Sequence, residues 1–445
     1  MKVSIIGTGY VGLVTGVCLA EKGHQITCVD VDQAKVDSIN NGIPPIYERG
    51  LEDLLKRHIG GLLRATTDLT RAVQQTDLSL IAVGTPFNGR EIDLTFIKAV
   101  SKEIGHALRK KPGYHAVIVK STVVPGTTDE VVCPILEEAS GKKAGVDFGV
   151  GMNPEFLTEG EAINDFLSPD RIVLGGIDKA TIDQQAGLYQ GFPGVEVLRT
   201  NNKTAEMIKY ASNAVLATLI SFSNEIANLC ASVKDVDIVD VMRGVHLSRY
   251  LSVDMPDGKR VQPPIVSFLA AGCGFGGSCF PKDVKALVAH GERKKTPMHV
   301  LDAVLKVNEN QPAKVVQLLK KQFTSLKGVH VAILGLAFRP DTNDMRESPA
   351  IPIVRELLDE GAVLKCYDPA AMEEAAKVFK GQPIVFCNAL EEAIKDVDAI
   401  VLVTRWEQFR RLPEILKKQH VQPLVVDGRR LIERSSIARY EGIGV

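Results

Sequence analysis

The chain has 445 residues, of which 45% are hydrophobic and 24% are charged, and its formal net charge is −1. This length favours two or three domains, and the composition is that of a globular protein with enough apolar residues for separate cores. The near-neutral charge gives no reason to expect a nucleic acid or a membrane surface as a partner.

The cysteines and the N-terminus both indicate a reduced, cytoplasmic protein. The eight cysteines are dispersed along the chain and form no C-x-x-C pair, so neither a disulfide framework nor a metal site is expected. The first residues enter a strand directly, without the apolar core and cleavage site of a signal peptide. No apolar run approaches the roughly 20 residues that a transmembrane helix needs.

The first motif is a glycine-rich turn between a strand and a helix. A β-branched strand at 3–6 precedes Gly7-Thr8-Gly9-Tyr10-Val11-Gly12, and a second strand at 25–29 ends at Asp30. This is the dinucleotide-binding pattern: the glycines let a pyrophosphate approach a helix N-terminus, and the acidic residue accepts the ribose hydroxyls. A carboxylate at position 30 would repel a 2′-phosphate, so NAD is favoured over NADP.

Two later strands continue this first α/β domain. The strand at 78–83 ends at Gly84-Thr85-Pro86, and the strand at 116–119 ends at Lys120-Ser121-Thr122. Ligands of open α/β sheets bind beyond the carboxyl ends of the strands. Thr85, Ser121 and Thr122 are therefore candidates for the edge of the cofactor site, or simple turn and cap residues.

Two carboxylates follow in the segment 153–160. Glu155 and Glu159 are four residues apart, so a helix that starts after Pro154 would place both on one face. Paired carboxylates suit a general base or ligand hydroxyls, and the alternative is a solvated helix start.

The middle of the chain contains one long helical pattern. Residues 205–233 lack proline and glycine and carry apolar residues at helical spacing on more than one face, which is typical of a buried helix or of a spine against a partner subunit. Lys209 and Asn213 stand one turn apart on it. Residues 245–268 are irregular in sequence and indicate a loop.

The stretch from Gly272 to Asp283 combines glycines with two cysteines. Glycine at that density allows a backbone to approach a ligand closely, and Pro281 suits the first turn of a helix. Cys279 would then precede a helix N-terminus, where the partial positive charge stabilises a thiolate. This makes Cys279 a candidate nucleophile, and a glycine-rich turn with an inert cysteine is the alternative.

The C-terminal part indicates a second doubly wound domain. A helical pattern at about 298–321 leads to a strand at 329–334, and further strands end at Tyr367, Thr404 and Asp427. Only one glycine marks its first turn, so the dinucleotide pattern is absent. Arg346 and Arg429 are suited to a phosphate or a base edge, which favours a nucleotide that forms part of the substrate.

Together these motifs resemble the UDP-glucose/GDP-mannose dehydrogenase family over nearly the whole chain. The resemblance is carried by the following motifs: Gly7–Gly12 with Asp30, Val83–Pro86, Lys120–Thr122, Asn153–Gly160, Ala205–Lys209 with Asn213, Gly274–Asp283, Asp341–Pro349 and Asp427–Arg430. It implies two Rossmann-like doubly wound domains joined by a central helical domain with one long helix. The expected ranges are 1–198 for NAD binding, 199–310 for a dimerising helical domain with the cysteine loop, and 311–445 for the sugar nucleotide.

The resemblance also implies the chemistry, a four-electron oxidation of a hexose 6-hydroxymethyl to a carboxylate with two NAD. A base, or a base-activated water held by Thr122 and Asp283, would remove the hydroxyl proton, and Cys279 would pass through a thiohemiacetal and a thioester. Glu155 would assist hydrolysis, while Lys209 and Asn213 would stabilise the oxyanions.

By similarity, the expected binding residues form two groups. Those assigned to NAD are Gly7, Gly9, Tyr10, Val11, Gly12, Asp30, Lys35, Thr85, Pro86, Ser121, Thr122, Glu159, Lys282 and Arg346. Those assigned to the sugar nucleotide are Glu155, Phe156, Leu157, Glu159, Lys209, Asn213, Arg260, Ala270, Gly272, Gly274, Phe275, Gly276, Phe338, Arg339 and Arg429.

Two departures from the family pattern affect the substrate site. Arg339 follows Phe338 where the family usually has lysine, and the loop between Arg249 and Ser267 is longer than usual. That loop normally supplies an arginine, often across the dimer, and either Arg249 or Arg260 could be that residue.

UDP-glucose is the favoured substrate, with GDP-mannose as the alternative. A two-electron hydroxyacid dehydrogenase and a non-enzymatic NAD-responsive binding protein are more distant possibilities. A two-electron dehydrogenase would yield one NADH per substrate instead of two. A non-enzymatic binding protein would turn over no nucleotide sugar at all.

Overall fold

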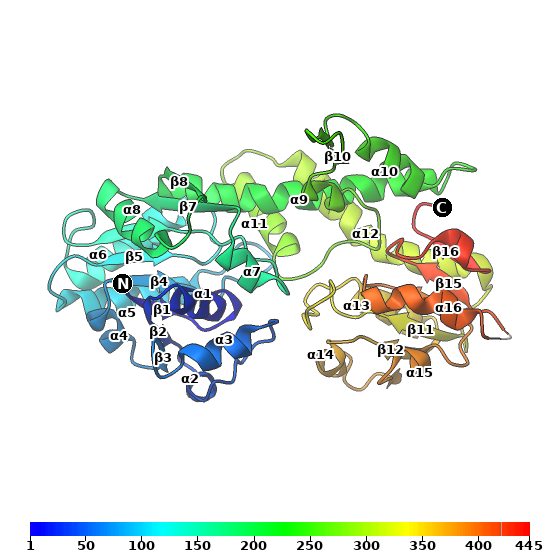
Figure 1. Cartoon of the computed structure of the whole chain (residues 1–445), viewed down its shortest axis with the longest axis horizontal. Coiled ribbons are helices and arrows are strands. Elements are labelled where there is room, and N and C mark those ends of the chain that lie inside the picture. The colour runs from blue at the N-terminus through cyan, green and yellow to red at the C-terminus, as the bar shows by residue number, and fades with distance from the viewer. Residues whose placement is uncertain (420) are drawn as a thin grey trace. The chain divides into compact units, whose positions relative to one another are not determined.

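The computed structural model describes residues 1–419 and 421–445. The chain forms two compact units, Met1–Ser212 and Asn213–Val445, which are described separately (Figure 1). Helix α9 (Asn202–Cys230) contains the boundary between them. It begins three residues before the predicted helix and ends three residues before its predicted end.

The first unit is built on one sheet of eight strands, all within the described residues 1–212. Their order is β3-β2-β1-β4-β5-β6-β7-β8, and the pairing is parallel except between β6 and β7. The strands are β1 (Lys2–Ile6), β2 (Gln25–Val29), β3 (Leu63–Thr66), β4 (Leu78–Ile81), β5 (Ala116–Val119), β6 (Gly149–Met152), β7 (Arg171–Gly176) and β8 (Glu196–Thr200).

Helices cover both faces of this sheet, which explains why its central strands are continuous apolar runs. Val3 and Ile5 of β1 pack with α1, α3 and α7, whereas Ile6 packs with α4, α5 and α6. The helices are α1 (Tyr10–Glu21), α2 (Gln33–Asn40), α3 (Leu51–His58), α4 (Leu69–Gln75), α5 (Thr95–Arg109), η1 (Thr128–Val132), α6 (Cys133–Ser140), α7 (Ala162–Leu167), α8 (Lys179–Ala186) and η2 (Gly187–Tyr189).

The second unit begins with helices and ends in a parallel sheet. Its first elements are the rest of α9, α10 (Ile238–His246), the hairpin β9 (Val253–Asp254) and β10 (Arg260–Val261), η3 (Pro264–Phe268), α11 (Phe280–Arg293) and α12 (His299–Gln322). The predicted irregular segment 245–268 thus contains a short hairpin. Helix α12 continues through Pro312, and it matches the predicted helix at 298–321.

Six strands form the sheet of the second unit within its described residues, in the order β13-β12-β11-β14-β15-β16 and parallel throughout. The predicted second doubly wound domain is therefore confirmed. Its elements are β11 (His330–Leu334), α13 (Ala350–Asp359), β12 (Val363–Tyr367), α14 (Met372–Val378), β13 (Ile384–Phe386), α15 (Leu390–Ala393), β14 (Ala399–Leu402), η4 (Glu407–Arg411), α16 (Leu412–Leu416), β15 (Leu424–Asp427), η5 (Arg434–Ser436) and β16 (Tyr440–Gly442).

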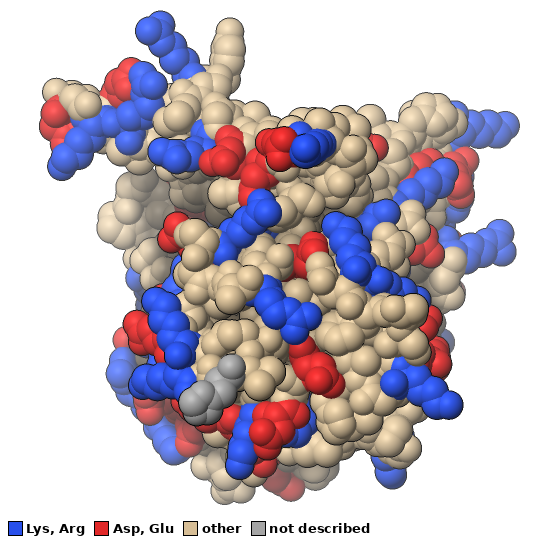
Figure 2. Space-filling model, turned by 90° about the vertical axis from the view of Figure 1, so that its right-hand side faces the viewer, with Lys and Arg blue, Asp and Glu red and all other residues tan. Residues whose placement is uncertain are grey.

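Figure 2 shows acidic and basic side chains interspersed over the face that it draws. In the described part of the chain, no helix has both the length and the hydropathy that crossing a bilayer requires.

Two glycines of the first turn have different structural roles, and this yields a prediction about stability. A Cβ on Gly12 would lie 1.9 Å from the carbonyl oxygen of Gly7, whereas a Cβ on Gly9 would meet nothing within 4 Å. We expect Gly12→Ala to lower the free energy of unfolding by about 3 kcal/mol and Gly9→Ala to change it by less than about 1 kcal/mol. Urea denaturation of both variants measures the difference, and equal stabilities would contradict it.

Candidate active site

The glycine turn and Asp30 lie at the carboxyl ends of β1 and β2 and form a candidate binding site for an anion and a ribose. Gly9 directly precedes α1, whose first backbone N–H groups have no partner within the helix. The carboxylate of Asp30 accepts hydrogen bonds from the Thr8 amide at 2.9 Å, the Thr8 hydroxyl at 2.6 Å and the Asp32 amide at 3.1 Å. Burial alone would raise the pKa of Asp30, but these bonds lower it on balance. Asp30 is thus held as a fixed, ionised acceptor.

The candidate residues at the ends of β4 and β5 tie these two strand ends together. The hydroxyl of Thr85 donates to the carbonyl of Thr122 at 2.7 Å, and the hydroxyl of Ser121 donates to the carbonyl of Val83 at 2.7 Å. Both hydroxyls therefore bond to backbone carbonyls, and these two bonds fix the position of Thr122.

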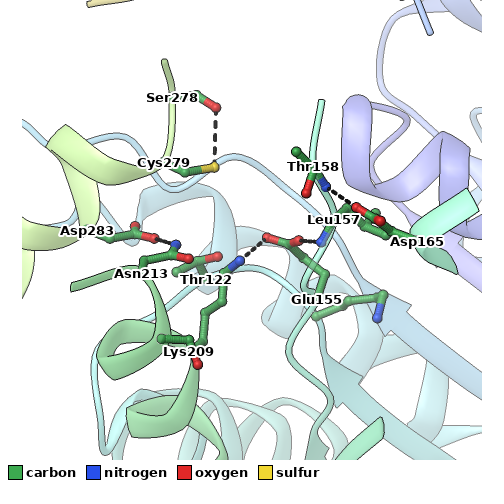
Figure 3. Close-up of polar contacts among 12 residues, drawn as sticks. Thr122, Glu155, Leu157, Thr158, Asp165, Lys209, Asn213, Ser278, Cys279 and Asp283 are labelled. Carbon is green, nitrogen blue, oxygen red and sulfur yellow. Dashed lines mark hydrogen bonds and ion pairs between the residues drawn. The ribbon is translucent and has the colours of Figure 1, made fainter. Parts of the chain in front are cut away.

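Glu155 and Lys209 form a buried ion pair within the first unit (Figure 3). Their charged atoms lie 2.9 Å apart, and the side chains are only 6% and 3% exposed. The second carboxylate oxygen of Glu155 accepts from the Leu157 amide at 2.7 Å. Burial alone would raise the pKa of Glu155, but the charge and hydrogen bond of Lys209 and the Leu157 bond outweigh burial and lower it. The carboxylate is therefore ionised and oriented.

No helix starts directly after Pro154, so the condition under which Glu155 and Glu159 would share a helix face is not met. Residues 153–158 have no regular secondary structure, and the next helix, α7, begins only at Ala162. Glu155 and Glu159 therefore do not share a helix face. The reason is that Glu155 binds the amide of Leu157 and a lysine of α9, which sequence spacing cannot reveal.

Lys120 and Asn153 lie beside this ion pair, and the sequence analysis gave neither of them an individual role. Lys120 is 3% exposed and donates to the side-chain oxygen of Asn153 at 3.1 Å, which also accepts from the hydroxyl of Tyr189 at 2.5 Å. Burial lowers the pKa of Lys120 to about 8. The only sequence signal was its position at the end of an apolar strand, directly before Ser121.

In the second unit, the glycine-rich segment lies along the carboxyl end of the parallel sheet. The Cys273 amide donates to the Gly428 carbonyl at 2.7 Å, and the Gly277 amide donates to the Arg346 carbonyl at 2.8 Å. The guanidinium of Arg429 donates to the Gly274 carbonyl at 2.8 Å. Gly272 and Gly274 therefore lie against Arg429, and their predicted contact with a sugar nucleotide stays a prediction.

Close contacts explain the glycines of this segment. A Cβ on Gly276 would lie 2.3 Å from the carbonyl oxygen of Glu347, and one on Gly277 would lie 2.7 Å from the ring of Phe338. The side chain of Asn308 bonds both the amide and the carbonyl of Phe275, at 2.7 and 3.1 Å. Asn308 was not predicted, because it lies on α12 and only the fold brings it to the segment.

Cys279 stands directly before α11, where the sequence placed it, and Pro281 lies in the first turn. The hydroxyl of Ser278 lies 3.6 Å from the Cys279 sulfur. One turn into α11, the buried carboxylate of Asp283 accepts a hydrogen bond from the side-chain amide of Asn213 at 2.6 Å (Figure 3). It also accepts one from the ammonium group of Lys282 at 2.5 Å. Asn213, Cys279 and Asp283 all belong to the second unit.

Several predicted binding residues have other partners. Arg260 pairs with Asp254 on the β9–β10 hairpin at 2.7 Å, and Arg346 pairs with Asp344 at 2.8 Å. Lys35 lies in α2, where its charge lowers the pKa of Asp30. Val11 lies in the first turn of α1 rather than before the helix, and Pro86, Ala270 and Arg339 lie in segments without regular helix or strand.

The first-unit residues fit NAD, and no metal centre is indicated. The open space at Gly9, the N-terminus of α1 and the anchored carboxylate of Asp30 match a pyrophosphate and a ribose. Among the described residues, no group of three or more histidine, cysteine or acidic side chains could hold a metal ion.

Family models match three consecutive parts of the chain. They are described as the NAD binding domain (residues 1–193), the central domain (residues 203–310) and the UDP binding domain (residues 332–434) of the UDP-glucose/GDP-mannose dehydrogenase family. Fold and site thus define an NAD-dependent oxidoreductase that acts on a nucleotide sugar.

Similar proteins span the whole chain. UDP-glucose 6-dehydrogenase AglM of Haloferax volcanii is 40% identical, with 100% of both chains covered. GDP-mannose 6-dehydrogenase of Pseudomonas syringae pv. syringae is also 40% identical, with 93% of each covered. A solved UDP-glucose dehydrogenase from Pyrobaculum islandicum superimposes with a TM-score of 0.90 at 37% identity and covers 99% of this chain and 97% of its own. The chain belongs to the UDP-glucose/GDP-mannose dehydrogenase family, and its cofactor is NAD.

The Glu155–Lys209 pair yields a prediction about the pH dependence of stability. Because folding lowers the pKa of Glu155 from its ordinary value of 4.5, its stabilisation is complete above that value and is lost as the pH falls through the lower folded pKa. We expect Glu155→Gln to cost about 3 kcal/mol at pH 7, since it removes the carboxylate from a buried lysine. Below pH 4.5 the deficit relative to wild type should shrink.

Denaturant unfolding between pH 3 and pH 8 measures this deficit, with Glu196→Gln, an exposed residue of β8, as the matched control. A deficit that does not change with pH would contradict an ionised Glu155 in the folded protein.

Proposed function

We propose that the protein oxidises the C6 hydroxymethyl of UDP-glucose to a carboxylate and consumes two NAD in this four-electron reaction. The observation that carries the proposal is the position of Cys279 at the start of α11, at the end of a glycine-rich segment bonded to the carboxyl end of a parallel sheet. A thiol that holds an aldehyde covalently allows both oxidations before release. UDP-glucose relatives with full coverage support the choice of hexose.

In the first oxidation, a water held by Thr122 and Asp283 accepts the proton of the substrate hydroxyl. When bound, NAD accepts a hydride from the substrate carbon in each oxidation. The resulting aldehyde carbon forms a bond with the Cys279 sulfur, and the oxygen takes up a proton to complete a thiohemiacetal. Lys209 and Asn213 stabilise the negative charge that develops on this oxygen.

The second oxidation converts the thiohemiacetal to a thioester with loss of the hydroxyl proton. Glu155 orients a water that attacks the thioester carbon, the carbon–sulfur bond breaks, and the thiolate returns. The sum is one alcohol, one water and two NAD converted to one carboxylate, two NADH and three protons. The ionised Glu155, fixed by Lys209 and the Leu157 amide, is suited to accept a proton from that water.

We further propose the division of labour between the remaining predicted residues. Residues 270–276 and Arg429 cradle the sugar nucleotide, where Arg429 already bonds the backbone of the segment. Residues 1–198, 199–310 and 311–445 form the three functional parts. A cytoplasmic location agrees with eight cysteines that form no disulfide, all within the described residues.

GDP-mannose is the second candidate substrate. GDP-mannose 6-dehydrogenases from Pseudomonas match this chain with 39–40% identity, so overall identity does not separate the two hexoses. A panel of UDP-glucose, GDP-mannose, UDP-galactose and UDP-N-acetylhexosamines, scored by the initial rate of NADH formation, separates them directly.

The thiol mechanism is tested by Cys279→Ala and by the NADH yield of the wild-type enzyme. We expect two NADH per nucleotide sugar, and we expect the alanine variant to lose more than 99% of acid formation while its Kd for NAD stays within about twofold. Cys133→Ala is the matched control, because Cys133 is likewise a partly exposed cysteine but lies on α6, outside the proposed site.

A yield of one NADH per substrate would refute the four-electron reaction. Unchanged turnover in Cys279→Ala would refute the nucleophile. Cys279→Ser adds a third measurement, because a trapped ester would increase the intact mass by that of the acyl group.

We also propose that the protein is a homodimer through helix α9. Val215, Phe222 and Leu229 are spaced by seven residues and are 48%, 46% and 61% exposed, so they form one apolar stripe along the helix. Such a stripe on a long helix is typical of a subunit interface.

Disruption of this stripe should change the oligomeric state. We expect Phe222→Asp to convert the dimer to a monomer, because a desolvated carboxylate at the centre of an interface costs several kcal/mol. Val146→Asp, at a 73% exposed residue outside the stripe, should leave the dimer intact. Light scattering after size exclusion measures both, and a wild-type mass equal to the monomer would contradict the proposal.

A further inference from the structure

Glu48 is a buried carboxylate in the segment between α2 and α3 to which no role has been assigned so far. Its side chain is 6% exposed, and among the described residues it forms no ion pair with a lysine, arginine or histidine. Instead it accepts three hydrogen bonds. They come from the hydroxyl of Tyr10, the amide of Gly160 at 2.8 Å and the amide of Ala162 at 3.0 Å. A buried carboxylate is stable only with such partners.

The donors come from two different binding segments of the first unit. Tyr10 follows Gly9 and is the first residue of α1, so it belongs to the turn that receives the pyrophosphate of NAD. Gly160 follows Glu159 and ends the segment that begins at Asn153 and contains Glu155. Its amide lies 3.2 Å from the hydroxyl of Tyr10 as well as 2.8 Å from Glu48. One carboxylate and one phenol therefore connect both segments.

The segment 153–160 depends on such side-chain contacts because it has no regular secondary structure. Figure 3 shows two of its other contacts, the Leu157 amide with Glu155 and the Thr158 amide with Asp165, at 2.7 and 2.8 Å. Both remain inside the segment and the helix that follows it. Glu48 and Tyr10, in contrast, attach the segment to the cofactor turn, and the Ala162 bond satisfies an amide at the start of α7.

We propose that Glu48 is a positioning residue that couples the two binding segments, so that the nucleotide-sugar segment 153–160 and the NAD turn are held in register through Tyr10. The role of segment 153–160 in substrate binding rests on the proposed function, whereas the contact with the NAD turn does not. Loss of Glu48 releases the Gly160 amide of segment 153–160, the Ala162 amide at the start of α7 and the hydroxyl of Tyr10. Affinity for NAD should therefore fall even though Glu48 lies outside the glycine turn.

The test is a double-mutant cycle on NAD binding, measured by calorimetry without any nucleotide sugar. We expect Glu48→Gln and Tyr10→Phe each to raise the Kd for NAD about tenfold, the loss of one hydrogen bond to a charged group. The double variant should be no weaker than either single variant, because both changes break the same link. Glu52→Gln, an exposed residue of α3 paired with Lys56, is the matched control and should bind NAD like wild type.

Two results would overturn the proposal. Additive losses in the double variant would mean that Tyr10 acts on NAD independently of Glu48. A Glu48→Gln variant with wild-type Kd and only a lower Tm would mean that the carboxylate is structural. If Glu48→Gln does not fold, Glu48→Asp replaces it in the double-mutant cycle with Tyr10→Phe, and the same two outcomes decide.

A kinetic arm separates this inference from the proposed function. For a nucleotide sugar that the wild-type enzyme oxidises, Glu48→Gln should raise the KM at least fivefold. Tyr10→Phe should raise it less, because only Glu48 binds the Ala162 amide. Absence of turnover for every nucleotide sugar in the wild-type enzyme would refute the proposed function and leave the NAD cycle interpretable. An unchanged KM for the sugar in an active Glu48→Gln enzyme would refute the coupling.

Discussion

Both units depend on one constraint: loops at the carboxyl ends of parallel strands pack directly against neighbouring backbone. In the first unit, Gly12 has room only for a hydrogen where the Gly7 carbonyl approaches it. In the second, Gly276 faces the Glu347 carbonyl, and Gly428 would place a Cβ 2.6 Å from the Leu402 carbonyl. Side chains at these positions would push the loops away from the strand ends, which is where a doubly wound sheet binds its ligands. The glycines therefore allow these loops to lie directly against the neighbouring backbone.

Buried carboxylates then fix the loops that the glycines allow to approach. Glu206 is fully buried on α9 and accepts from the Gly126 amide, the Thr128 amide and the Thr128 hydroxyl at 2.6, 2.8 and 2.7 Å. Glu48 and Glu155 hold other loops in the same way, each with at least two donors. Such groups cost stability when one donor is missing, so each of them selects one loop conformation over its alternatives.

The sequence predicted the elements that local patterns encode and missed those that depend on distant partners. The first two strands, the glycine turn, the long helix and the helix after Cys279 were visible because their periodicity and their glycine and proline signals are local. The antiparallel pairing of β6 with β7 and the β9–β10 hairpin were not predicted, since pairing joins residues far apart in sequence or, in the hairpin, strands of only two residues. No helix starts directly after Pro154, for the related reason that Lys209 holds Glu155 from another helix. Glu48, Lys120 and Asn308 were missed because a single polar residue has no periodicity, and only the fold shows what it contacts.

The two cysteines of the glycine-rich segment lie in different physical environments. Cys273 is fully buried, its sulfur lies 3.6 Å from the Val403 carbonyl, and burial raises its pKa despite the nearby charge of Arg429. A thiol in that environment stays protonated and packs as a small apolar side chain. Cys279 is partly accessible and stands at the start of α11, whose N-terminal dipole favours a negative charge. The same segment thus holds one thiol that packs against the sheet and another that is partly accessible at a helix N-terminus, and this difference arises from where the helix begins.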